Sequence, residues 1–225
     1  LLIIVFSFLL ILKQPDLGTG LIVLFSGSIM LWFMGLSVRF FALCACIFLC
    51  TAPLSWQFLK PYQKKRILVF FGQGTRNKER YQIEQSKIAV GSGGIIGKGF
   101  QQGTQNKMSF LPESRTDFIF SVICEEIGFT GALFVILLYL FLFLRIIFLI
   151  FLINSIYAKL ICFGLLVPII LSTIINICMV LDLMPVVGIP LPFMSYGITH
   201  IWTGFASIGC INSVTCQRYA QDFIT

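Results

Sequence analysis

Three carboxylates in the middle of the chain lie where a polar stretch becomes a long apolar run. Asp117 ends the polar stretch, and Glu125 and Glu126 follow inside the apolar run from 118 to about 144. A carboxylate at such a junction lies at a membrane surface, within reach of a hydroxyl group presented there, and can act as a general base. The alternative for Asp117 is a helix N-cap or first-turn acid stabilised by the helix dipole.

The two glutamates differ in their expected register. On a continuous helix that starts at Asp117, Glu125 lies about 80° around the axis and about 12 Å deeper, and Glu126 falls on the opposite face. An ionisable group at that depth usually faces a polar cavity or a partner charge. Glu125 is therefore either a second catalytic residue or a structural acid that packs helices, and the pattern does not decide between them.

Basic residues in the polar stretch suit an anionic substrate. Lys87, Lys98, Lys107 and Arg115 can donate charge-assisted hydrogen bonds to a diphosphate leaving group. The alternative is a solvated basic loop attracted to anionic lipid headgroups. Ser195 has no adjacent base and no nucleophile-elbow motif, so we expect it to shape the rim of the binding cavity.

Nothing in the sequence requires a cofactor. The eight cysteines form no CxxC pair and no cluster with the single histidine, His200, so they are interpreted as small apolar residues. A divalent cation could assist a diphosphate, but no group of acids specifies a site for one. No feature points to nucleic acid as a partner.

The composition requires a membrane. Hydrophobic residues make up 58% of the 225 positions and charged residues only 11%, and apolar runs recur at the length that spans a bilayer as a helix. We predict an all-α, polytopic transmembrane fold in one membrane domain over 1–225. The predicted spans are 1–12 (partial), 17–36, 40–59, 118–144, 160–181 and 198–217. The short first span and the absence of an initial Met suggest a truncated N-terminus.

Residues 60–117 are too polar to lie in hydrocarbon, since they carry eleven Lys or Arg and four acids. Their positive charge alone would place them in the cytoplasm, but short loops report orientation better than long ones. Arg39, Arg145, Lys159 and Arg218 all lie on the opposite side. We therefore predict one large extracytoplasmic loop at 60–117. The stretch 184–197 has three prolines and is expected to be irregular.

Several stretches resemble the SEDS family of shape, elongation, division and sporulation proteins, and they follow the family's order along nearly the whole chain. They include KQPDLGT at 13–19, the stretch 85–99 with its five glycines, TDFIF at 116–120 and PLPFMSYG at 190–197. Residues 13–16, 98–99 and 103–105 resemble the elongation branch, RodA, more than the division branch, FtsW. Arg115 departs from the family pattern, which commonly has His there.

The resemblance implies an activity, the polymerisation of lipid II into glycan strands during cell elongation, in the bacterial inner membrane. It assigns the essential aspartate to Asp117 and implies ten transmembrane helices, of which this chain holds the later ones. The expected partners are lipid II as substrate, a class B penicillin-binding protein and membrane lipids. Lys87, Lys98, Arg115 and Ser195 are the expected substrate-binding residues, with Asp117 and Glu125 as catalytic candidates.

Two other classes of function remain open at this stage. A flippase for the lipid-linked precursor would also use kinked helices and intramembrane carboxylates. A non-catalytic scaffold for a cell-wall transpeptidase would need only a docking surface. Against the flippase, the richest motif lies in the predicted outer loop and not at the bilayer midplane.

The orientation is testable with a cysteine at Gln101, in a background whose native cysteines are replaced. We expect an impermeant thiol reagent to label it in intact spheroplasts, because the loop faces away from the cytoplasm. Labelling that appears only after lysis would reverse the topology.

Overall fold

The computed structural model is built from helices throughout its described ranges, which confirms the predicted all-α class. It describes residues 1–14, 16–44, 46, 50, 64, 68–69, 78–104, 113 and 115–222. Most of the predicted span 40–59 and much of the polar stretch, Lys107 included, lie outside these residues. The helices are α1 (Leu2–Lys13), α2 (Leu17–Phe33), α5 (Lys78–Ser92), α7 (Ile119–Phe151), α8 (Ile156–Val180) and α9 (Ile198–Asp222).

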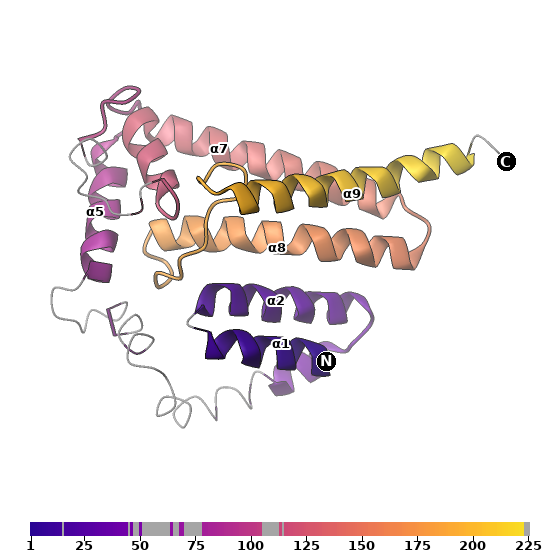
Figure 1. Cartoon of the computed structure of the whole chain (residues 1–225). Helices are drawn as coiled ribbons and strands as arrows, with labels where there is room; N and C mark the ends of the chain where they lie inside the picture. The colour runs from indigo at the N-terminus through magenta and orange to yellow at the C-terminus, as the bar shows by residue number, and fades with distance from the viewer. Residues whose placement is uncertain are drawn as a thin grey trace.

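The long helices lie side by side, and one short helix crosses their end. Figure 1 shows α7, α8 and α9 stacked next to α2 and α1, with α5 standing across the ends of α7 and α8. Within the described residues, α7 and α8 are the helices long and apolar enough to cross a bilayer. Many of their large apolar side chains face outward, among them Phe134, Phe141 and Phe148. This outward apolar surface is typical of helices that lie in lipid.

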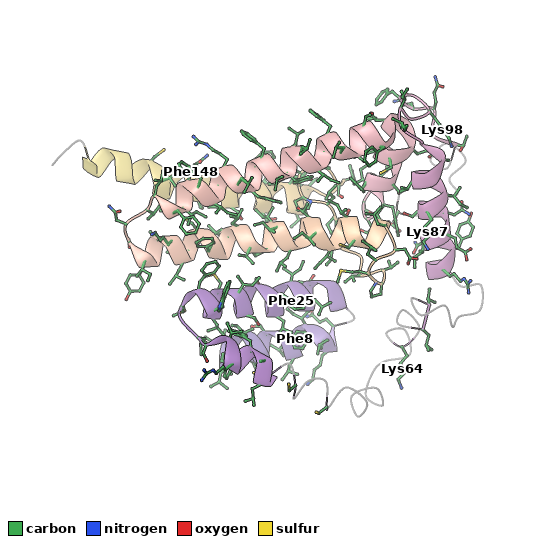
Figure 2. All side chains as sticks on the ribbon, turned by 180° about the vertical axis from the view of Figure 1, so that it is seen from behind. Phe8, Phe25, Lys64, Lys87, Lys98 and Phe148 are labelled. Carbon is green, nitrogen blue, oxygen red and sulfur yellow. The ribbon has the colours of Figure 1, made fainter. Side chains whose placement is uncertain are left out.

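The polar stretch contains a helix that the sequence analysis did not predict. One face of α5 is buried through Gln82, Ile83, Ser86 and Ala89, whose spacing of three or four residues is helical. The Ser86 hydroxyl donates to the Val180 carbonyl at 3.0 Å, and Lys87 forms an ion pair with Asp182. These contacts hold α5 against the end of α8, at the end of the molecule where Figure 2 shows Lys87 and Lys98.

Helix α7 is interrupted at Gly128, whose backbone angles of φ 75° and ψ −166° are not helical. The break frees the carbonyls of Glu125 and Glu126 and the amides of Phe129 and Thr130, which a regular helix would pair with each other. Residues 94–99 supply partners for all four. Lys98 N and Gly99 N donate to the two carbonyls at 3.0 and 2.9 Å, and the carbonyls of Gly94 and Ile95 accept from the two amides at 2.9 and 3.2 Å.

This insertion requires glycine. A Cβ atom at Gly97 would lie 2.3 Å from the Glu126 carbonyl oxygen, and one at Gly93 would lie 1.9 Å from that of Cys124. The glycines at 93 and 97 therefore form a close-packed contact with α7. At Gly91, by contrast, a Cβ would meet nothing within 4 Å.

We predict that Gly97→Ala lowers the thermal stability of the purified protein in detergent. The new methyl group must push the inserted segment away from α7, and Gly97 also has a φ of 85°, so we expect a loss of about 2 kcal/mol or more. Gly91→Ala is the matched control and should be neutral or stabilising by less than about 1 kcal/mol. Equal melting temperatures for the two variants would contradict the insertion.

Candidate functional site

The segment 115–117 is held by three hydrogen bonds, one at each backbone carbonyl, which come from α8 and from the loop after it. Tyr196 N donates to the Arg115 carbonyl at 2.8 Å, the Ser195 hydroxyl to that of Thr116 at 2.6 Å, and Asn176 Nδ2 to that of Asp117 at 2.8 Å. The next residue, Phe118, is 1% exposed. The backbone before α7 therefore has a fixed position relative to α8 and the loop between α8 and α9.

Asp117 lies one residue before the N-cap position of α7. That position is Phe118, and the first turn of the helix holds no acid. By position, Asp117 is therefore neither the N-cap residue nor a first-turn acid. The residue is half-buried, and a Cβ at Gly188 would approach its Oδ2 to 3.5 Å. Gly188 has a φ of 78°, so the loop turns tightly next to the carboxylate.

The loop at 181–197 is irregular, as its prolines predicted. Hydrogen bonds of the Ser195 side chain hold it in place. The Ser195 hydroxyl accepts from Leu191 N at 2.7 Å while it donates to the Thr116 carbonyl, and the residue is 2% exposed. Ser195 therefore joins this loop to the segment that carries Asp117. This contact is structural support for the candidate site.

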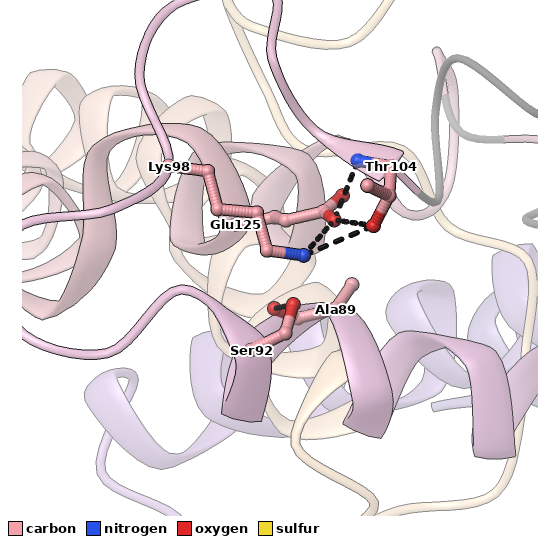
Figure 3. A network of polar contacts seen from close by, with 5 residues as sticks. All are labelled: Ala89, Ser92, Lys98, Thr104 and Glu125. Carbon is pink, nitrogen blue, oxygen red and sulfur yellow. Dashed lines mark hydrogen bonds and ion pairs between the residues drawn. The ribbon is translucent and has the colours of Figure 1, made fainter.

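Glu125 lies fully buried in an ion pair. Its Oε1 accepts from Lys98 Nζ at 2.8 Å and from the amide and hydroxyl of Thr104 at 2.8 and 3.0 Å, as Figure 3 shows. The same lysine donates to the Thr104 hydroxyl at 3.0 Å. Glu125 and Lys98 therefore compensate each other's charge and fix the segment 98–104 to α7.

Glu126 binds the same segment as Glu125. It is 9% exposed, and its Oε2 accepts from Gln101 N at 3.0 Å. Both glutamates lie on α7 just before the break at Gly128. The expectation that Glu126 lies on the face opposite Asp117 stays a prediction.

The basic residues that were predicted to bind a diphosphate do not all present an unpaired charge. Lys87 is paired with Asp182 and Lys98 with Glu125. Arg115 is exposed, and its backbone is part of the held segment, two residues before Asp117. Within the described ranges no group of three or more His, Cys, Asp or Glu side chains could hold a metal ion.

Asn176 is the residue that sequence reasoning missed. It is fully buried in α8, and its Nδ2 donates to the carbonyl of Ile189 at 2.7 Å as well as to that of Asp117. One side chain thus ties the backbone of Asp117 to the loop that carries Gly188. A polar amide inside an otherwise apolar run was the available signal, because a buried amide needs hydrogen-bond partners.

We predict that Asn176→Leu speeds amide hydrogen exchange at residues 116–119 and lowers the melting temperature in detergent. Leucine keeps the approximate size but leaves two carbonyls without this donor, at a cost of about 1–3 kcal/mol each. Thr173→Val is the matched control, because Thr173 is also buried in α8 but donates only to Ile169 within its own helix. If both variants leave the exchange at 116–119 unchanged, Asn176 does not fix Asp117.

Comparison with known proteins gives a consistent result. A family model described as a cell cycle protein, covering FtsW, RodA and SpoVE, matches residues 1–220. The chain is 41% identical over 211 residues to peptidoglycan glycosyltransferase MrdB of Helicobacter pylori, covering 93% of this chain and 54% of that protein. It is 37% identical over 220 residues to MrdB of Escherichia coli, covering 97% of this chain and 60% of that protein.

A solved structure agrees with the sequence relatives. A chain of a peptidoglycan synthase complex superposes with a TM-score of 0.75 at 29% identity, covering 93% of this chain and 58% of that chain. The chain thus spans between half and two thirds of the length of these relatives. By the extent of the family match and by these identities, the chain belongs to the FtsW, RodA and SpoVE family of membrane proteins, as its motifs indicated.

Proposed function

We propose that the protein containing this chain is a peptidoglycan glycosyltransferase that polymerises lipid II, and that Asp117 is its general base. The observation that carries the proposal is the way Asp117 is held. Its backbone is fixed through three consecutive carbonyls, those of residues 115–117, and the residue itself is only half-buried. A base must be held within reach of the proton that it removes, and this arrangement supplies that constraint.

In the proposed reaction the Asp117 carboxylate accepts the proton of the acceptor sugar's hydroxyl group. The hydroxyl oxygen forms a bond to the anomeric carbon of the donor, and the bond from that carbon to the diphosphate breaks. The polyprenyl diphosphate leaves with the bonding electrons, so the configuration inverts in a single displacement. Arg115 is the exposed cation on the same segment and can stabilise the negative charge on the leaving group.

The geometry supports structural roles for the other candidates. Glu125 and Lys98 satisfy each other inside the protein, so neither presents an unpaired charge to a substrate. Lys87 is paired with Asp182. Ser195 is buried beneath the segment that it holds and does not act as a nucleophile. A diphosphate is a ligand for divalent cations, so a cation bound together with the substrate remains compatible with this proposal.

The relatives also suggest where the protein acts and with what. We place it in the bacterial inner membrane, with residues 60–117 on the outer side, where lipid II presents its sugars. A penicillin-binding protein is the proposed partner, since the solved structural relative comes from a complex that coordinates polymerisation and crosslinking. The higher identities to relatives named MrdB or RodA than to one named FtsW, at 34%, favour a role in elongation.

We predict that Asp117→Asn in the full-length protein lowers the rate of glycan synthesis by about 10² to 10⁴ while leaving folding intact, because the amide keeps the size of the side chain but cannot take up the proton. The measurement is polymerisation of lipid II in detergent with the transpeptidase partner, followed by gel separation of the glycan strands. Detergent has no two compartments, so strand formation cannot be explained by flipping.

Asp182→Asn is the matched control, since it makes the same chemical change at a residue whose ion-pair partner within the described residues is the exposed Lys87. It should retain at least about half of the rate, as an exposed ion pair contributes little to stability. Polymerisation at the wild-type rate by Asp117→Asn would remove Asp117 from the mechanism. A wild-type protein that makes no glycan in detergent but moves the precursor across liposomes would favour the flippase.

A further inference from the structure

The backbone at Phe193 is strained. Its φ is 65°, in the left-handed region that a bulky side chain rarely adopts. Phe193 lies in a tight turn, in which the Leu191 carbonyl accepts from Met194 N at 3.3 Å and from Ser195 N at 3.0 Å. A strained conformation persists only where its surroundings hold it. What holds this turn bears on the candidate site, because Ser195 ends the turn and binds the Thr116 carbonyl.

The Phe193 ring is held by α9. It packs edge to face against Phe205, with 5.4 Å between the ring centroids. It also lies so close to Gly204 that a Cβ there would be 2.7 Å from the ring. These contacts fix the side chain. They do not fix the peptide group between Pro192 and Phe193, whose orientation sets the φ of Phe193.

Tyr139 holds that peptide group. It lies on α7, is 8% exposed, and its hydroxyl donates to the Pro192 carbonyl. Pro192 is also buried. A rotation of the peptide group toward an ordinary φ at Phe193 would turn this carbonyl away from the hydroxyl, and a buried carbonyl that loses its donor is costly. The Tyr139 hydroxyl therefore opposes relaxation of the turn.

Two further hydrogen bonds lead from the turn to the candidate base. The amide of Leu191, next to Pro192, donates to the Ser195 hydroxyl at 2.7 Å. That hydroxyl donates to the Thr116 carbonyl at 2.6 Å, in the peptide group that leads into Asp117. Leu191 and Ser195 are 1% and 2% exposed, so the turn is closely packed on both sides of the strained residue. A shift of the turn must therefore move the peptide group before Asp117.

We propose that Tyr139 is a positioning residue for the base Asp117. The inference rests on the proposed function, since it requires Asp117 to act as the base. Tyr139 keeps the turn at Phe193 in its strained form, and this form places the Ser195 hydroxyl on the Thr116 carbonyl. A base acts only at hydrogen-bond distance from the proton that it removes, and a misplacement of about 1 Å can lower a rate by about 10². A tyrosine that only filled the core could be replaced by phenylalanine without a change in rate.

The test removes the hydroxyl alone, with Tyr139→Phe in the full-length protein and its transpeptidase partner. We expect kcat for polymerisation of lipid II to fall about tenfold and KM to change less than twofold, because the loss is felt where the base acts and not in substrate binding. Tyr157→Phe is the matched control, since it removes the same group from a residue that is 78% exposed, and it should change neither constant. An unchanged kcat in Tyr139→Phe would overturn the proposal.

A double-mutant comparison separates positioning from a general loss of folded enzyme. If Tyr139 acts through Ser195, then Tyr139→Phe should lower kcat less than twofold further in a Ser195→Ala background, because the link is already broken there. A tenfold loss in both backgrounds would mean that the two residues act independently, and Tyr139 would then have no positioning role.

Amide hydrogen exchange needs no turnover and separates this proposal from the proposed reaction. Tyr139→Phe should speed exchange at 191–195 and at 116–119 by about tenfold, and Tyr157→Phe should not. If the wild-type protein makes no glycan but these amides respond, the link from Tyr139 to the Asp117 segment stands and the proposed reaction is wrong. If glycan forms but the amides at 116–119 do not respond, the reaction stands and the positioning role is wrong.

Discussion

The interruption of α7 at Gly128 is the constraint on which the outer end of the structure depends. A broken helix at the edge of a membrane leaves backbone groups that neither lipid nor a side chain can easily satisfy. Here the segment 94–99 supplies a partner to each of the four freed backbone groups, as donor to two carbonyls and as acceptor from two amides. The polar stretch before Asp117 is thereby joined to the transmembrane bundle by backbone bonds, and glycine is needed on both sides of the contact.

The buried ion pair follows from this insertion. Glu125 lies just before the break, and Lys98 is the residue whose amide enters it, so their side chains meet as a consequence of the backbone pairing. Removing one partner of such a pair would leave an uncompensated charge in the protein interior, which is strongly destabilising. The pair therefore makes the register of the insertion specific. Glu125 and Lys98, which the sequence suggested as site residues, therefore stabilise the fold instead.

The candidate site is also held by hydrogen bonds, which two side chains and one backbone amide donate to backbone carbonyls. Asn176 comes from the last turns of α8, and Ser195 and Tyr196 come from the loop that follows this helix. Together they hold the three consecutive residues 115–117, of which Asp117 is half-buried.

The sequence by itself determined the class of fold, the positions of the long apolar helices, the irregular proline-rich loop and the family, since each follows from local composition or from a contiguous motif. It also singled out Asp117 as the acid at the boundary between polar and apolar sequence. Only the tertiary structure decided that α5 forms, that Glu126 binds the same segment as Glu125, that Lys98 forms an ion pair with Glu125, and that Asn176 holds the backbone of Asp117. These features depend on contacts between segments distant in the sequence and on one glycine with a non-helical backbone, and periodicity along a single helix carries no information about either.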